Sequence, residues 1–223
     1  MSGTGLDAVL ARLRAAEAAA GRPAGAVTLL AASKQQSADT IRATAARGQR
    51  IYGENYVQEA LPKMAALADL DLSWHFIGRL QRNKTRDVAA HFDWLHTLDR
   101  ADLARRLSAQ RPAGKPPLQV LIEVNVGGEG SKGGVTSAEV AALAAEIRQL
   151  PGLALRGLMC LPAPETDPQR QRAAFAMLRA TLHALADPGL DTLSMGTSGD
   201  LEAAVAEGAT IVRVGTALFG ARA

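Results

Sequence analysis

The chain has 223 residues, of which 48% are hydrophobic and 21% charged, a composition typical of a globular protein and not of a disordered one. The net charge of +3 is small and scattered, so the charge indicates no nucleic-acid partner. A single cysteine, Cys160, excludes an intramolecular disulfide and a multi-cysteine metal site, and no apolar stretch of about 18 residues predicts a membrane span, so we expect a cytoplasmic protein.

Short aliphatic runs alternate with alanine-rich helical patterns along the chain. A helix is predicted first, over Leu6–Ala20, and Gly21 ends it. Eight strands are then predicted, at Val27–Ala32, Arg50–Gly53, Trp74–Ile77, Trp94–Thr97, Gln119–Val124, Leu155–Met159, Thr192–Ser194 and Thr210–Val214. The segments between them predict helices, at Ser37–Arg47, Gln58–Ala68, Lys84–His91, Ala101–Ala109, Ser137–Gln149, Gln169–Ala186 and Leu201–Glu207.

This alternation favours the α/β class, as a parallel (β/α)8 barrel (a TIM barrel) with an extra N-terminal helix. A doubly wound open sheet is the alternative, because alternation alone does not show whether the first and last strands pair. No composition shift or block of like charge marks a boundary, so we expect a single domain over residues 1–223. Barrel enzymes and binding proteins place their sites at the carboxyl ends of the strands, so the residues that follow each strand are the candidates.

Lys34 follows the first predicted strand directly. The strand is almost purely apolar, and a helix with Ser37 as its expected N-cap comes next. One interpretation is a lysine whose stem covers apolar surface while its amine reaches water. The other is an amine suited to a Schiff base with a carbonyl compound. The position of Lys34 alone does not decide between the two.

The second and third strands lead into further polar residues. Asn55 and Gln81 are uncharged hydrogen-bonding groups that fit either a ligand site or a turn. We expect Trp74 and Phe76 to lie in the core and His75 to be a hydrogen-bonded barrel histidine.

The last two strands are followed by turns rich in small and hydroxyl residues. Residues 195–200 read Met-Gly-Thr-Ser-Gly-Asp, and residues 213–220 read Arg-Val-Gly-Thr-Ala-Leu-Phe-Gly. Such turns offer backbone N–H groups, hydroxyl donors and a helix start, which together suit a phosphate. Phosphate sites of barrels commonly follow the seventh and eighth strands. Because strand eight neighbours strand one in a closed barrel, a ligand with both an aldehyde and a phosphate, such as pyridoxal 5′-phosphate (PLP), would reach Lys34 as well. A sugar phosphate is the alternative ligand.

Several blocks of the chain match a known pattern in the same order. They are Ala32–Lys34, Tyr52–Glu59, Trp74–Lys84, Ser131–Gly134, Arg156–Met159, Ser194–Asp200 and Val212–Gly220. The sequence thereby resembles the pyridoxal phosphate homeostasis protein family, which is related to the N-terminal barrel of alanine racemase. The resemblance implies a barrel of that type with PLP held as an internal aldimine on Lys34. It also implies that Ser198, Gly215 and Thr216 hold the phosphate with Gly199 nearby, that Asn55 lies near the ring, and that Arg213 faces the pyridine nitrogen.

An arginine beside the pyridine nitrogen disfavours protonation of that nitrogen and weakens the ring as an electron sink. Alanine racemases also use a tyrosine from a second domain, whereas the tyrosines of this chain, Tyr52 and Tyr56, both lie in the second-strand block. The resemblance therefore implies a protein that keeps PLP (vitamin B6) in balance without strong catalytic activity, with PLP-dependent apoenzymes as candidate partners. The alternative is a slow amino acid racemase or another aldimine-dependent enzyme.

The remaining expectations concern the other lysines and the assembly. We expect Lys63, Lys84, Lys115 and Lys132 to be solvated, although Lys84 and Lys132 lie in family blocks and could form secondary cofactor or partner sites. Departures from the family pattern, such as Arg79 and Thr197, affect the edge of the site. The alanine-rich helix faces permit a monomer or a weak dimer, and we expect a monomer.

Overall fold

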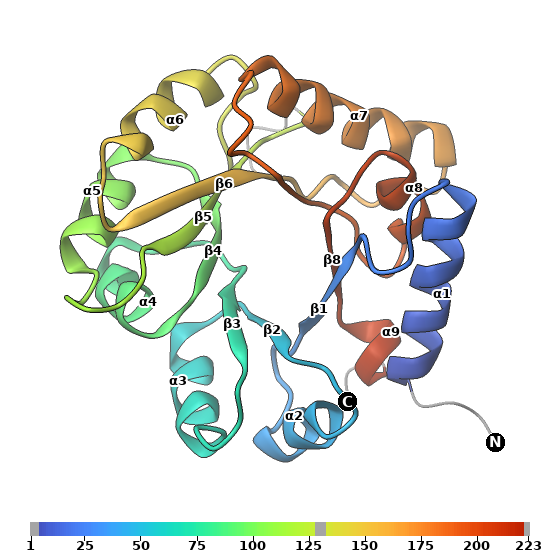
Figure 1. The fold of residues 1–223 in the computed structure, drawn as a ribbon, viewed down its shortest axis with the longest axis horizontal. Helices are drawn as coiled ribbons and strands as arrows, with labels where there is room; N and C mark the ends of the chain where they lie inside the picture. The colour runs from blue at the N-terminus through green and yellow to red at the C-terminus, as the bar shows by residue number, and fades with distance from the viewer. Residues whose placement is uncertain (1–4, 128–132, 221–223) are drawn as a thin grey trace.

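The computed structural model describes residues 5–127 and 133–220, and in these ranges eight parallel strands close into a barrel in chain order (Figure 1). All eight predicted strands are present. Their bounds are β1 (Thr28–Ala32), β2 (Ile51–Glu54), β3 (Ser73–Phe76), β4 (Trp94–Leu98), β5 (Leu118–Glu123), β6 (Leu153–Met159), β7 (Thr192–Ser194) and β8 (Ile211–Val214).

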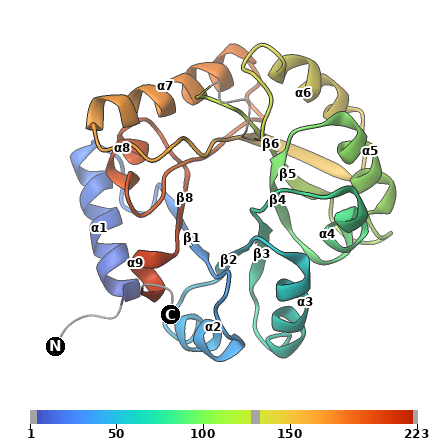
Figure 2. The same cartoon turned by 180° about the vertical axis from the view of Figure 1, so that it is seen from behind.

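Helices surround this barrel on the outside, as the views from both sides show (Figures 1 and 2). Over the described ranges they are α1 (Gly5–Ala19), α2 (Ala38–Ala45), α3 (Val57–Ala66), the short 3₁₀ helix η1 (Arg82–Lys84), α4 (Thr85–His91), α5 (Ala101–Gln110), α6 (Val140–Arg148), α7 (Pro168–Ala184), α8 (Leu201–Ala206) and α9 (Thr216–Phe219). No helix within these ranges is long and apolar enough to cross a membrane.

The pairing of β1 with β8 closes the ring. Thr28 lies opposite Ile211, and Ala31 lies opposite Val214, in parallel register. An open doubly wound sheet leaves its outer strands unpaired, so that alternative is wrong and the (β/α)8 barrel is confirmed. Closure puts the carboxyl ends of all eight strands on one rim of the barrel.

Apolar side chains from the strands and from the inner faces of the helices form the core. Trp74 and Phe76 are buried in it, as predicted, with exposed fractions of 7% and 2%. Phe76 meets Phe92 edge-on, with ring centroids 5.4 Å apart. At Gly53 a Cβ atom would lie 2.4 Å from Leu30 Cδ2, so the strand needs glycine at that position.

The helix ends follow from local capping. Ser37 caps α2, as predicted, because its side chain accepts a hydrogen bond from the backbone N–H of Thr40. Helix α7 starts at Pro168 because Asp167 caps it and proline is favoured at the first helical position. Helix α9 was absent from the predicted helices, since four residues carry too little periodicity to be recognised.

The extra N-terminal helix, α1, lies beside α8 and α9 on the outside of the barrel (Figure 1). Leu6, Val9 and Leu13 form its buried face. Arg12 of the same helix pairs with Glu202 of α8, with 2.5 Å between Nε and Oε1. The helix therefore covers the segment of chain that follows β7 and β8.

Candidate functional site

Six of the seven residues that the sequence nominated meet at one cavity on the carboxyl rim of the barrel. The cavity has a volume of about 250 Å³ and is lined in part by Lys34, Asn55, Ser198, Arg213, Gly215 and Thr216. They come from the exits of four strands, β1, β2, β7 and β8, which barrel closure makes neighbours. Lys34 and Thr216, which are far apart in the chain, thus share one site.

The lining of this cavity is cationic. Among the described residues that form it, Lys34 and Arg213 are charged, and no carboxylate is present. Lys34 is half-buried at the end of β1. The hydroxyls of Ser198 and Thr216 lie at the start of α9, where the first backbone N–H groups have no acceptor within the helix. This set of donors and cations suits an anionic ligand that also offers a group to the amine.

The turn after β7 gets its shape from a glycine and an aspartate. Gly196 has φ of +93°, and a Cβ atom at that position would lie 2.5 Å from Ala204 Cβ. Asp200 accepts hydrogen bonds from the backbone N–H of Thr197 at 2.5 Å and from its hydroxyl at 2.8 Å. The turn therefore presents Ser198 towards α9, where the Ser198 hydroxyl lies 3.5 Å from the backbone nitrogen of Ala217.

Arg12 supports the same turn from helix α1. Its Nη1 atom donates to the carbonyl oxygen of Ser198 at 2.7 Å, while Glu202 binds the rest of the guanidinium. Sequence reasoning missed Arg12, because the residue lies in a helix that precedes the first strand and belongs to no turn motif. The extra helix thus contributes directly to the support of the site.

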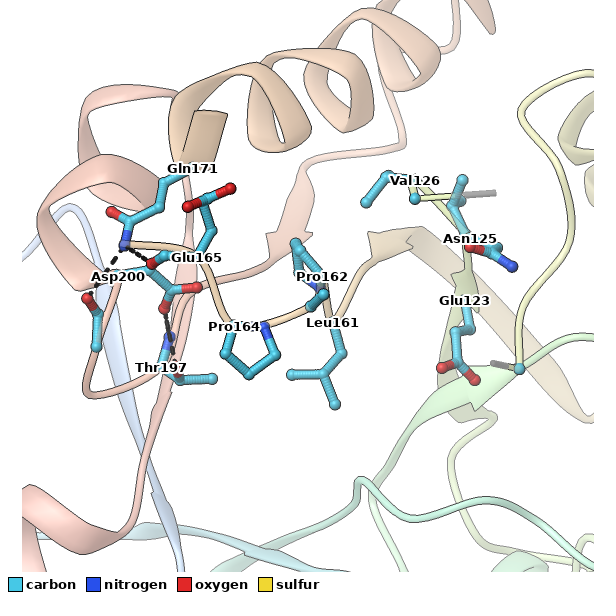
Figure 3. A pocket seen from close by; sticks show the side chains of 15 residues that line it. Glu123, Asn125, Val126, Leu161, Pro162, Pro164, Glu165, Gln171, Thr197 and Asp200 are labelled. Carbon is cyan, nitrogen blue, oxygen red and sulfur yellow. Dashed lines mark hydrogen bonds between the residues drawn. The ribbon is translucent and has the colours of Figure 1, made fainter. Parts of the chain in front are cut away.

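Gly199, the seventh nominated residue, does not line this cavity. It lines a neighbouring cavity of about 480 Å³ on the same rim. Figure 3 shows that Glu123 and Asn125 lie on one side of that cavity and Glu165, Gln171 and Asp200 on the other. Leu161 and Thr197 line both cavities, so the two spaces adjoin.

Arg213 is held rigidly inside the barrel. It is 6% exposed, and its Nη1 and Nη2 atoms donate to Ser194 Oγ at 2.7 Å and to the carbonyl oxygen of Cys160 at 2.8 Å. Burial lowers the pKa of Arg213, yet an arginine keeps its proton in proteins. The site therefore contains a fixed, buried cation at β8.

A chain of hydrogen bonds continues from Ser194 across the barrel. Ser194 Oγ lies 2.9 Å from His96 Nδ1, His96 Nε2 lies 2.9 Å from His75 Nδ1, and His75 Nε2 lies 3.1 Å from Ser73 Oγ. Burial lowers the pKa of His75 to about 3 and that of His96 well below its ordinary value, so both rings are neutral. Neutral rings satisfy every bond when each group donates to the next, from Arg213 to Ser73. The expected role of His75 as a hydrogen-bonded barrel histidine is confirmed, whereas sequence reasoning missed His96 and Ser194.

The other four lysines differ in their surroundings. The expectation that Lys63 is solvated is wrong, because its side chain is 11% exposed and pairs with Glu54 at 2.9 Å. Lys115 is exposed, as expected. Lys84 is half-buried and lines a third cavity of about 340 Å³ together with Tyr56 and Arg79, and Asn55 lines both this cavity and that of Lys34. Lys132 lies outside the described residues.

Comparison with known proteins identifies the family of this barrel. Residues 5–223 match the family model of the alanine racemase N-terminal domain, which defines the class of barrel. A curated relative from Pseudomonas aeruginosa is 58% identical over 96% of this chain and 93% of its own, and one from Escherichia coli K12 is 49% identical over 95% and 92%. Both are named pyridoxal phosphate homeostasis protein, and this chain belongs to their family.

A solved structure is similar over almost its whole length. The structure of PipY from Synechococcus elongatus with PLP bound is 40% identical, with a TM-score of 0.82, over 93% of this chain and 98% of PipY. The PLP-free form of PipY superposes equally well, with a TM-score of 0.83.

Proposed function

We propose that this protein binds pyridoxal 5′-phosphate covalently through Lys34 and serves in the intracellular homeostasis of that cofactor. The observation that carries the proposal is that one cavity holds both the amine of Lys34 and the hydroxyls of Ser198 and Thr216. An aldehyde and a phosphate on one small ring can occupy these two places together. The names of the curated relatives and the PLP bound to PipY support the same ligand.

The residues present fit the cofactor. The phosphate would be bound by Ser198, Thr216 and the backbone of Gly215, at the start of α9. Within the described part of the chain, Asn55 Oδ1 is buried beside the cavity without a hydrogen-bond partner, so Asn55 has an acceptor to offer to a ring substituent. When bound, the cofactor would supply an aldehyde for attachment and a pyridine ring that can delocalise charge.

Two features of the site support a binding role without strong catalysis. Arg213 keeps a buried cation in the cavity, and a cation beside the pyridine nitrogen disfavours protonation of that nitrogen. Neither tyrosine is among the described residues that line the cavity of Lys34. Tyr52 is fully buried with its hydroxyl 2.8 Å from Thr44 Oγ1, and Tyr56 lines the cavity of Lys84, which shares Asn55 with the cavity of Lys34. We propose that this arrangement stores and delivers PLP instead of activating an amino acid.

We further propose that residues 1–223 act as a single cytoplasmic domain, as a monomer, and pass PLP to apoenzymes that depend on it. The barrel spans β1 to β8 and the family match spans residues 5–223, which supports one domain. Gel filtration together with transfer of PLP to an apo-aminotransferase would test the assembly and the partner.

The direct test of the binding role is the absorbance spectrum of the protein with PLP. Wild-type protein is expected to show the visible band of a Schiff base, and Lys34→Ala is expected to lose it. Lys115→Met is a matched control, because Lys115 is exposed on the loop before β5, at the opposite rim. A wild-type spectrum without this band would disprove covalent binding.

A slow enzyme is the second candidate, favoured by the adjoining cavity of about 480 Å³, which offers room for a substrate beside Lys34. Hydrogen–deuterium exchange at the Cα atom of L-alanine in heavy water tests this candidate. Exchange at rates typical of racemases would favour an enzyme over a carrier.

A further inference from the structure

The backbone that carries Lys34 forms a tight turn over residues 33–36, here named the lysine turn. The carbonyl oxygen of Ser33 accepts a hydrogen bond from the backbone N–H of Gln36 at 3.0 Å. Gln35, the third residue of the turn, has φ of +63°, in the left-handed region that residues other than glycine seldom adopt. Such a conformation costs about 1–2 kcal/mol and persists only when the surroundings enforce it.

The enforcing contacts come from Lys63 and Glu54. Lys63 Nζ donates to the carbonyl oxygen of Ser33 at 2.9 Å and to Glu54 Oε1 at 2.9 Å. Glu54 Oε1 also accepts a hydrogen bond from the Ser33 hydroxyl at 2.6 Å. Two side chains thus hold the carbonyl and the hydroxyl of the residue that immediately precedes Lys34, while its backbone N–H donates to the carbonyl oxygen of Gly53 at 2.9 Å.

A second carboxylate holds the other side of the turn. Glu59 Oε2 accepts a hydrogen bond from the backbone N–H of Gln35 at 3.2 Å. Glu59 and Lys63 lie four residues apart on α3, which places them on one face of that helix. This face of α3 therefore forms hydrogen bonds with the lysine turn on both sides of Lys34, at Ser33 and at Gln35.

The ion pair is buried, which makes a purely stabilising role a weak explanation. Ser33 and Glu54 are 0% exposed and the Lys63 side chain 11% exposed. Desolvation of two buried charges offsets much of their attraction, and apolar replacements of such pairs are often as stable. Burial indeed raises the pKa of Glu54 despite the nearby ammonium. An apolar pair in place of Lys63 and Glu54 could not form hydrogen bonds with the carbonyl and hydroxyl of Ser33, and so could not hold them in place.

We infer that Lys63, through Glu54 and Ser33, is a positioning residue that aims the amine of Lys34 at the aldehyde carbon of the ligand. The inference rests on the proposed function. In the attachment step the neutral Lys34 amine adds to the aldehyde carbon, and the aldehyde oxygen leaves as water with the two hydrogens of that amine, so that a C=N bond replaces the C=O bond. A displacement of about 1 Å in such a nucleophile can cost up to about 100-fold in rate.

The test separates covalent attachment from non-covalent binding. Attachment is measured as the rate at which the Schiff-base band appears after PLP is added. Non-covalent binding is measured as the calorimetric affinity for pyridoxine 5′-phosphate, which has the same ring and phosphate but an alcohol in place of the aldehyde. The variants are Lys63→Met, the double variant Lys63→Met with Glu54→Gln, and Lys115→Met as the control. The double variant avoids an unpaired buried carboxylate.

We expect both Lys63 variants to form the band about tenfold more slowly or worse, while their affinity for pyridoxine 5′-phosphate stays within about twofold of wild type. Lys115→Met should match wild type in both measurements. Wild-type rates in the Lys63 variants, a parallel loss of pyridoxine 5′-phosphate affinity, or failure of both variants to fold would overturn the inference. Absence of the band from wild-type protein itself would instead overturn the proposed function, and the inference with it.

Discussion

Arg213 and Ser194 are joined inside the barrel by a hydrogen bond of 2.7 Å between Nη1 and Oγ. Ser194 ends β7 and Arg213 belongs to β8, so the bond crosses between neighbouring strands at the level of the site. Ser194 also meets His96, which lies on β4 on the far side of the ring. The hydroxyl therefore links the buried cation of the site to the interior of the barrel.

Removal of this hydroxyl should destabilise the protein. Ser194→Ala leaves a donor of Arg213 buried without an acceptor, and an unsatisfied buried group costs about 1–3 kcal/mol. Urea unfolding of Ser194→Ala and wild type measures this loss. Ser73→Ala is the control. Ser73 is the last residue of the same series of hydrogen bonds but is only half-buried, so water can replace its hydroxyl. Equal losses for the two variants would contradict a special role for Ser194.

The two buried histidines should make stability depend on pH. Burial lowers the pKa of His75 to about 3 and that of His96 well below the ordinary value, whereas both titrate near 6.5 in the unfolded chain. Below that pH the unfolded state binds more protons than the folded state. The stability that the two neutral histidines contribute is therefore fully present above about pH 6.5. It is lost as the pH falls from there towards their pKa values in the folded state, at up to about 1.4 kcal/mol per pH unit for each histidine.

Urea unfolding between pH 5 and pH 8 measures how steeply the free energy of unfolding changes with pH. His75→Asn and His96→Asn should each reduce this slope, relative to wild type, by the equivalent of about one bound proton. The histidine at the end of α4, His91, serves as the control, since His91→Asn changes an exposed ring outside this hydrogen-bond network. A slope that stays the same in both core variants would show that other groups cause the acid sensitivity.

Loss of Arg12 should weaken phosphate binding. Arg12→Met removes the donor to the Ser198 carbonyl, so the turn after β7 loses one of its supports. We expect the affinity for pyridoxine 5′-phosphate to fall about 3- to 10-fold, measured by calorimetry, which corresponds to the net contribution of about one typical hydrogen bond. Arg47→Met is the matched control, because Arg47 pairs with Asp7 of α1, the helix that carries Arg12, and forms no hydrogen bond with the turn. An equal effect of both variants would indicate general loosening of α1.

Cys160 should resist chemical modification in the folded protein. Burial raises the pKa of Cys160 to about 12, so almost none of the reactive thiolate exists at pH 8. A thiol-reactive dye is expected to label native protein far more slowly than protein unfolded in urea. Rapid labelling of the native protein would mean that the segment after β6 opens readily.

The sequence allowed the strands and the site residues to be predicted because both have local signals. Short aliphatic runs mark the eight strands, and Lys34 stands out as a lysine at the end of an apolar strand. Ser198 and Thr216 stand out because they lie in turns rich in small residues. Ser37 could be predicted as a helix cap because serine is favoured at the position just before a helical pattern.

The contacts that support the site could not be predicted in this way. The sequence pattern at Lys63 is that of a solvated helical lysine, and only the packing of α3 beside β1 and β2 buries it against Glu54. Arg12 reaches Ser198 across 186 positions of the chain. Local composition thus determined which residues bear the chemistry. The closed register of the barrel decided which of them meet, because contacts between distant residues depend on how the strands pair and not on their neighbours in sequence.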